Sequence, residues 1–209
     1  SNSRVAIESF PIDERSPALR DLQLAKDNLP NDKALGVTWN IERDVLVVNF
    51  KKYAEIINTR RGVLAMIASV YDPLGAASPL ILPGKIINQE LCSSGLRWDE
   101  PLNDDFQKRW DIWMNELIKL QSIEFERCFV AKNFGRLMHI ELHHFADASE
   151  KYGYGSVSYL RFIDENDRVH CCFVFGKSRV NPLKSEMTIP KLELTAATML
   201  IPINRMILK

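Results

Sequence analysis

The chain has 209 residues and 46% of them are hydrophobic, which is enough to bury a sizeable core. Its 27 Lys and Arg balance its 27 Asp and Glu, which excludes an overall positive field that would draw it to nucleic acid or to an anionic membrane. No apolar run reaches the roughly 18 residues of a membrane span, and the four cysteines form no C-x-x-C pair, so we expect a reducing, intracellular environment without membrane contact.

The N-terminal quarter of the chain predicts a β-hairpin. Residues 1–33 are polar, contain three prolines and predict only one short helix. Two β-prone runs follow, at 34–39 and 45–50, and the polar residues between them favour a turn.

Three helices are predicted next. Thr59 is a suitable N-cap for a helix over 60–71, and Pro83 suits the first turn of a second helix. Asn103 opens a third helix, with Asp104 and Asp105 in its first turn. This helix has an apolar stripe that is typical of core packing: Phe106, Trp110, Trp113, Leu117 and Leu120.

Beyond residue 122 the apolar period approaches two, which predicts an antiparallel meander. The strands are expected at 125–130, 137–146, 155–161 and 169–175. A final helix is predicted over 191–208. Pro202 lies inside it, so we expect a kink near Thr198.

Two carboxylates are candidates for a metal site. Asp147 comes at the end of an alternating strand, and Glu193 lies at the start of the final helix. Mg²⁺ prefers hard oxygen ligands, and two-metal nucleases gather several carboxylates around such ions. Each residue also has an ordinary explanation, because Asp is a common turn former and a Glu at a helix start interacts with the helix dipole.

The other polar candidates are weaker. His143 and His144 are neighbours on a strand and must face opposite sides, so we expect one packed and one exposed histidine instead of a chelating pair. Arg60, Arg61 and Lys85 are candidates for phosphate contacts, although solvated helix faces explain them equally well.

Several blocks of the chain resemble, in order, the BEL/Pao retrotransposon polyprotein family. The resemblance covers roughly residues 33–208. The blocks that carry it are 61–79 (RGVLAMIASVYDPLGAASP), 96–102 (LRWDEPL), 145–149 (FADAS), 177–184 (KSRVNPLK) and 188–194 (TIPKLEL).

The resemblance implies an α+β fold that spans the end of a reverse transcriptase and the start of its RNase H domain. Its three expected parts are the end of the polymerase palm with the hairpin (1–50), a helical thumb or connection segment (51–121), and a partial RNase H-like domain with a mixed sheet and one covering helix (122–209).

The resemblance also implies roles for single residues. Asp147 and Glu193 correspond to the first two RNase H carboxylates, which would be both catalytic and Mg²⁺ ligands. Trp39 lies in the hairpin that resembles the one near the primer terminus, and Arg60, Arg61 and Lys85 lie in helices that resemble those holding template and primer. RNase H uses two further aspartates, which this sequence does not include.

The expected function is therefore that of a nucleic-acid-contacting fragment of an RNA-directed DNA polymerase and ribonuclease H, catalytically incomplete alone. Its expected partners are an RNA–DNA hybrid or template–primer duplex and the remainder of the polyprotein, in a cytoplasmic particle or in the nucleus. A non-enzymatic remnant that binds a protein partner is the alternative. Related regions are also labelled aspartic peptidases, but no glycine here completes an Asp-Thr-Gly or Asp-Ser-Gly motif.

Overall fold

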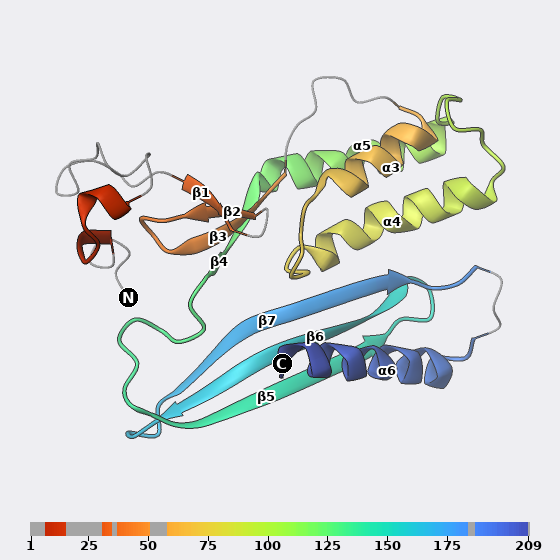
Figure 1. The fold of residues 1–209 in the computed structure, drawn as a ribbon. Coiled ribbons are helices and arrows are strands. Elements are labelled where there is room, and N and C mark those ends of the chain that lie inside the picture. Colours follow the sequence, from red (N-terminus) through yellow and green to blue (C-terminus); the bar gives the residue numbers. More distant parts are fainter. Residues whose placement is uncertain (1–6, 16–30, 35–36, 51–57, 184–186, 209) are drawn as a thin grey trace.

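The structure is a computed structural model that describes residues 7–15, 31–34, 37–50, 58–183 and 187–208. It has two antiparallel sheets and, within these ranges, the four α-helices labelled α3 to α6 (Figure 1). The predicted α+β class is confirmed. A short 3₁₀ helix, η1, spans Ile12–Glu14. None of the helices in the described ranges is both long and apolar enough to cross a membrane.

The first sheet contains the predicted hairpin. Its strand order is β1 (Asn31–Ala34), β2 (Val37–Asn40), β3 (Val45–Asn49) and β4 (Ser122–Glu126). β2 pairs with β3 across a turn that ends at Asp44, which has a positive φ of 58°. Asp is among the few residues that tolerate this left-handed conformation, so the turn chemistry agrees with the sequence.

β4 corrects the predicted meander. Its sequence was expected to begin a four-stranded meander at 125–130, but it lies at Ser122–Glu126 and pairs with β3, with Val48 opposite Ile123. Alternation identifies a strand without identifying its partner. Here the partner is decided by the long helix before it, which returns the chain to β3, where the Phe50 N–H donates to the Gln121 carbonyl at 2.8 Å. The predicted division placed β4 in the RNase H-like part (122–209). In the structure β4 instead pairs with β3, which belongs to the hairpin part (1–50).

Three helices pack beside this sheet: α3 (Arg60–Ser69), α4 (Ser78–Ser93) and α5 (Asp104–Leu120). The predicted caps are confirmed, because Thr59 accepts from the Gly62 N–H and Asn103 from the Phe106 N–H. The predicted start of the second helix is wrong by one turn. Pro79 occupies the first turn and Pro83 lies inside α4, since the Asp72 carboxylate orders residues 76 and 77 just ahead of the helix.

The apolar stripe of α5 lies in the core, as predicted, for three of its five members. Trp110, Trp113 and Leu117 are buried, Phe106 packs at the margin and Leu120 is exposed. The same core includes Val37, Val48 and Phe50 of the hairpin region. The hairpin and the three helices therefore share one hydrophobic core.

The second sheet consists of β5 (Leu137–Ala148), β6 (Gly153–Asp164) and β7 (Val169–Val180), paired in chain order. These are the last three strands of the predicted meander, each longer than expected. α6 (Ile189–Ile207) covers one face and continues through Pro202. Its buried Leu192 and Ala196 pack against Tyr154 of β6.

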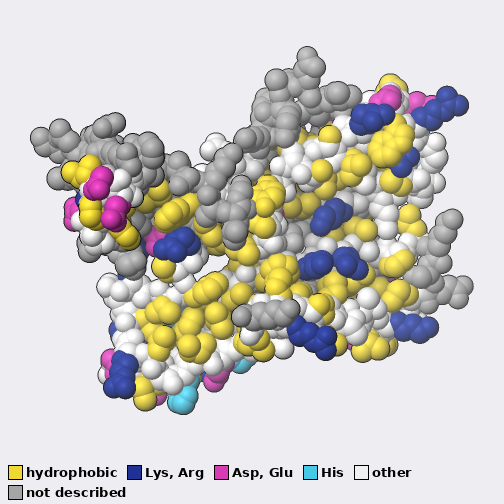
Figure 2. All heavy atoms as spheres, viewed as in Figure 1, with side chains coloured by type: hydrophobic (Ala, Val, Ile, Leu, Met, Phe, Trp, Pro, Cys, Tyr) yellow, Lys and Arg dark blue, Asp and Glu magenta, His cyan; other side chains and the backbone are white. Residues whose placement is uncertain are grey.

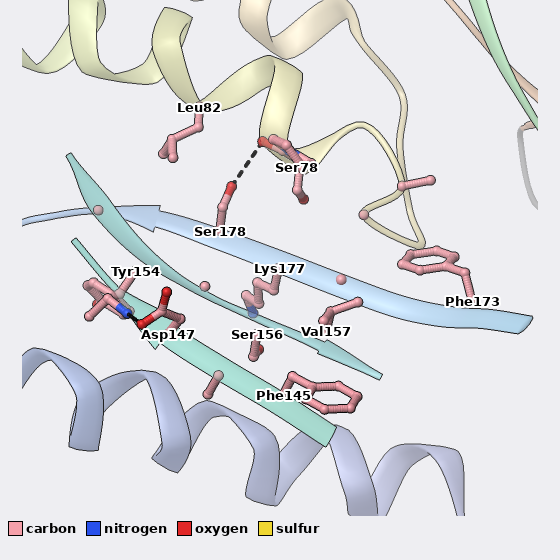
Figure 3. Close-up of a pocket in the computed structure, with 18 of the residues that line it drawn as sticks. Ser78, Leu82, Phe145, Asp147, Tyr154, Ser156, Val157, Phe173, Lys177 and Ser178 are labelled. Atoms are coloured by element: carbon pink, nitrogen blue, oxygen red, sulfur yellow. Dashed lines mark hydrogen bonds between the residues drawn. The ribbon is translucent and has the colours of Figure 1, made fainter. Parts of the chain in front are cut away.

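The helical part meets the second sheet at β7. The Gly176 N–H donates to the Leu74 carbonyl at 2.8 Å, and the Ser178 hydroxyl donates to the Ser78 carbonyl at 3.2 Å (Figure 3). Gln89 adds a bond from its side-chain amide to the Asn181 carbonyl at 2.6 Å. α4 thus lies beside the edge strand β7, and α6 covers one face of the sheet over β5 and β6 (Figure 1).

Candidate functional site

Asp147 lies near the end of β5 and is exposed. Its Oδ1 accepts from the Ala148 N–H at 2.8 Å. Figure 3 shows its side chain on the side of β5 that faces α4, away from α6. The predicted position at a strand end is therefore correct, and the structure adds the face to which the carboxylate points.

That face borders a cavity of about 730 Å³ between β4, the start of α4 and the second sheet. In Figure 2 a hollow separates the two lobes of the molecule, and hydrophobic side chains border it. The charged residues that line the cavity are Asp147 and Lys177. Its walls are otherwise largely apolar, so the surroundings of Asp147 differ from a carboxylate-rich metal site.

A row of aromatic rings crosses this face of the sheet. Phe145 of β5 meets Tyr159 of β6 with 6.2 Å between ring centroids, and Tyr159 meets Phe173 of β7 at 6.1 Å. Phe125 of β4 continues the row at 6.3 Å from Phe173. All three contacts are edge-to-face, the arrangement that ring quadrupoles favour. Sequence reasoning missed the row because its members come from four strands.

Glu193 lies on α6, which packs on the opposite face of the sheet from Asp147. Its neighbour Leu192 is buried against the sheet, while Glu193 itself is exposed. In the parts of the chain that the structure describes, no group of three or more His, Cys, Asp or Glu side chains is placed to hold a metal ion. Asp147 and Glu193 are not brought to one face, so the described residues do not form a fitting Mg²⁺ site.

The two neighbouring histidines behave as predicted. His143 is exposed and contacts Glu141 at 2.9 Å. His144 points to the α6 face, where its Nδ1 lies 2.7 Å from the fully buried Ser158 hydroxyl and its Nε2 lies 3.1 Å from Asn204 Oδ1. His144 therefore links β5, β6 and α6 instead of binding a metal together with His143.

Arg60 and Arg61, which were predicted to contact nucleic acid, hold the loop after α4. Both guanidinium groups pack over the Trp98 ring, that of Arg60 at 4.2 Å from its centroid. Arg61 also pairs with Asp99 through bonds of 2.7 and 3.0 Å, and this hydrogen bonding lowers the pKa of Asp99. These two arginines therefore have structural partners within the chain.

Lys85, the third predicted phosphate contact, is half-buried on α4. Burial lowers the pKa of Lys85, nearby Asp72 opposes that effect, and like-charge repulsion from Lys177 adds to it. Lys85 and Lys177 thus form a basic pair at the junction of α4 and β7. The sequence predicted Lys85 but not its neighbour, which is 92 positions further along the chain.

Trp39, the remaining predicted nucleic-acid contact, belongs to a polar cluster at the hairpin turn. Its ring N–H donates to Asp44 Oδ1 at 3.0 Å, and the Arg127 guanidinium lies over its ring at 5.1 Å. Arg127 also forms two hydrogen bonds with the buried Asp44 carboxylate, and the Cys128 thiol is a further partner. Asp44 therefore joins the hairpin turn to the segment that follows β4.

We expect the Asp44 cluster to make the free energy of unfolding depend on pH in the acid range. Burial alone would raise the pKa of Asp44, but hydrogen bonds from Arg127, Cys128 and Trp39 outweigh it, so the pKa is lowered. Because the pKa of the Asp44 carboxyl is lower in the folded state than in the unfolded state, its ionised form stabilises the fold. The stabilisation is complete at pH values above the unfolded-state pKa of about 3.9, and it is lost as the pH falls through the folded-state pKa. Asp44→Asn should lower the free energy of unfolding by about 2 kcal/mol at pH 7, because buried donors lose a charged acceptor.

Urea unfolding between neutral and acid pH measures this effect. The difference between wild type and Asp44→Asn should shrink below about pH 4. Asp99→Asn is the matched control, because Asp99 also pairs with an arginine but is exposed. Equal responses of the two variants would show that burial of Asp44 is unimportant.

A family model described as "Pao retrotransposon-like RNaseH-like domain" matches residues 59–209. No curated protein and no solved structure matches the chain. The matched residues include helices α3 to α5 and strand β4, as well as the second sheet and α6.

Proposed function

This chain belongs to the family of Pao retrotransposon-like RNaseH-like domains, and on that basis we propose that it contacts an RNA–DNA hybrid or template–primer duplex as a fragment of a reverse transcriptase and ribonuclease H. Family membership makes it a region of a retrotransposon polyprotein. The proposal adds the nucleic-acid partner, the remainder of the polyprotein as a second partner, and action within an intracellular particle.

The observation that carries the proposal is the order of the elements in the matched region. Three antiparallel strands, β5 to β7, are followed by one helix that covers the sheet. Asp147 closes the first of these strands, and Glu193 lies early in the helix. The resemblance to RNase H implies a carboxylate on the first strand and a second one on the first helix, and this implication is part of the proposal.

The basic pair supports contact with phosphate. Repulsion from Lys177 helps to lower the pKa of Lys85, although attraction to the nearby Asp72 opposes it. A phosphate group would relieve that repulsion. Arg60 and Arg61 are less suited to this role, because Trp98 and Asp99 already hold their guanidinium groups.

We further propose that the chain alone is catalytically incomplete. Hydrolysis by two metal ions needs carboxylates gathered around both ions. Asp147 and Glu193 are both exposed, α6 with Glu193 covers the face of the sheet opposite Asp147, and within the described residues no group of three or more potential ligands is placed to hold a metal ion. Mg²⁺ would therefore belong to a site completed by further carboxylates.

Binding to a fluorescently labelled RNA–DNA hybrid across a salt series tests the nucleic-acid proposal. We expect the affinity of the wild type to fall with salt. Lys85→Ala and Lys177→Ala should each weaken binding and reduce the slope of log affinity against log salt by about 0.9, the value for one phosphate contact. Lys119→Ala is the control, because Lys119 is exposed at the end of α5, away from the pair.

Binding that does not depend on salt, or that falls equally in all three variants, would contradict the proposed contact. In the same samples, Mg²⁺ should cause no cleavage of the hybrid. Mg²⁺ titrations of the wild type and of Asp147→Asn should coincide. A Mg²⁺-dependent difference between them would instead show a functional site around Asp147.

The alternative function, protein binding, is favoured by the apolar cavity beside Asp147. Its aromatic row and glycine backbone provide a hydrophobic surface that phosphate would not select. If the chain binds no hybrid at any salt concentration, protein binding becomes the better explanation.

A further inference from the structure

Residues 127–136 form a connector that joins β4 of the first sheet to β5 of the second (Figure 1). The connector is anchored at both ends. At its start, Arg127 forms two hydrogen bonds with the buried Asp44 carboxylate. At its end, the Gly135 N–H donates to Asp164 Oδ2 at 3.2 Å. The middle of the connector crosses between these two anchors.

This middle part exposes a peptide bond that follows an aromatic side chain. Phe129 is 46% exposed, Val130 is partly buried, and residues 131–133 are exposed. These residues belong to no helix or strand. Within the described part of the chain, no backbone hydrogen bond ties Phe129 or Val130 to another segment. Peptidases cut exposed loops in preference to paired strands and helices, because the substrate chain must extend into their cleft.

Other exposed aromatic rings lie on backbone that is held in place. Phe145 is 57% exposed, but it belongs to β5 and is paired with β6. Tyr152 is 52% exposed, but it lies in the turn between these strands, where the Ser149 N–H donates to the Gly153 carbonyl at 2.8 Å. Phe129 therefore differs from both in its unpaired backbone, although its ring is less exposed than theirs.

Contacts outside the connector hold the two parts of the molecule together. The Gly176 N–H of β7 bonds to the Leu74 carbonyl ahead of α4. Phe125 of β4 packs edge-to-face against Phe173 of β7, with 6.3 Å between ring centroids. A cut in the connector would therefore leave both parts attached, while it would remove the covalent limit on their movement.

We propose that the connector is a proteolytic processing site, cut between Phe129 and Val130 by an endopeptidase that selects an aromatic side chain. Water is the co-reactant. As the peptide bond breaks, the water oxygen becomes part of the new Phe129 carboxylate, and its two hydrogens end on the new Val130 amino group. The product is a complex of two chains, 1–129 and 130–209, held by the contacts at β7. This inference does not rest on nucleic-acid contact.

Limited digestion of the full 209-residue chain with chymotrypsin tests the proposal, because the pocket of this peptidase accepts aromatic side chains. Mass spectrometry should show that the bond after Phe129 is cut before those after Phe145 and Tyr152. Phe129→Ser and Val130→Pro should each protect the bond, since the first removes the aromatic ring and the second removes the N–H. Tyr152→Ser is the control and should be cut like the wild type. Circular dichroism confirms that each variant is folded.

The cut chain supplies a second readout. It should elute as one complex in size-exclusion chromatography and separate into two pieces only in urea. Separation without urea would overturn the proposal, as would faster cutting after Phe145 or Tyr152 than after Phe129.

Processing by the natural peptidase can be followed in cells that express the parent polyprotein. Chemical labelling of free α-amino groups, followed by mass spectrometry, should find such a group on Val130 in the wild type and not in Phe129→Ser. The proposal fails if the bond between Phe129 and Val130 stays intact in every product of the wild-type polyprotein.

Discussion

Gly75→Ala should destabilise the protein by about 3 kcal/mol, one of the largest losses that a single methyl group can cause here. Gly75 has a positive φ of 77°, which costs a residue with a Cβ roughly 1–2 kcal/mol. A Cβ at this position would also overlap the carbonyl oxygen of Gly176 on β7, and such overpacking typically costs about 1–3 kcal/mol. The two backbones cannot easily separate, because the Gly176 N–H bonds to the Leu74 carbonyl.

Urea unfolding followed by circular dichroism measures this loss, and Gly95→Ala separates its two causes. Gly95 has nearly the same φ, 78°, but no atom lies within 4 Å of the position of its Cβ. Gly95→Ala should therefore lose only the backbone part, about 1 kcal/mol. If both variants lost the same free energy, the close approach of Gly75 to β7 would contribute nothing to the attachment of the helical part to the second sheet.

Local features of the fold could be predicted well because short stretches of sequence determine them. The Asn103 cap needs only its own side chain and the next three residues, and the hairpin needs only its turn and two alternating runs. The stripe of α5 is equally local, since its period alone puts Trp110 and Trp113 on one side of the helix.

Long-range pairing could not be predicted in the same way. The alternation in β4 is compatible with pairing in either sheet. The choice depends on where α5 returns the chain, because Ile123 of β4 lies 75 residues after its partner Val48 in the sequence. Tertiary context decides such pairings, and a single sequence contains no direct record of it.

The candidate site shows the same limit. Alternation predicts that Asp147 shares a face of β5 with Phe145 and not with His144. It does not predict which face α6 will cover. That is decided by Leu192 and Ala196, which pack on Tyr154 of the neighbouring strand. The sequence therefore indicated two plausible carboxylates, while their separation by the sheet became visible only in the fold.

Trp110→Ala should have the largest effect of all, a loss of about 4 kcal/mol in the free energy of unfolding. Trp110 is 0% exposed, and its ring lies 5.1 Å from that of Trp113 in the core shared by the helices and the hairpin. Trp98→Ala is the control: its ring is 42% exposed and packs with Arg60, so its removal should cost about 1 kcal/mol or less. Urea unfolding compares the two variants. Similar losses in the two variants would contradict a core role for Trp110.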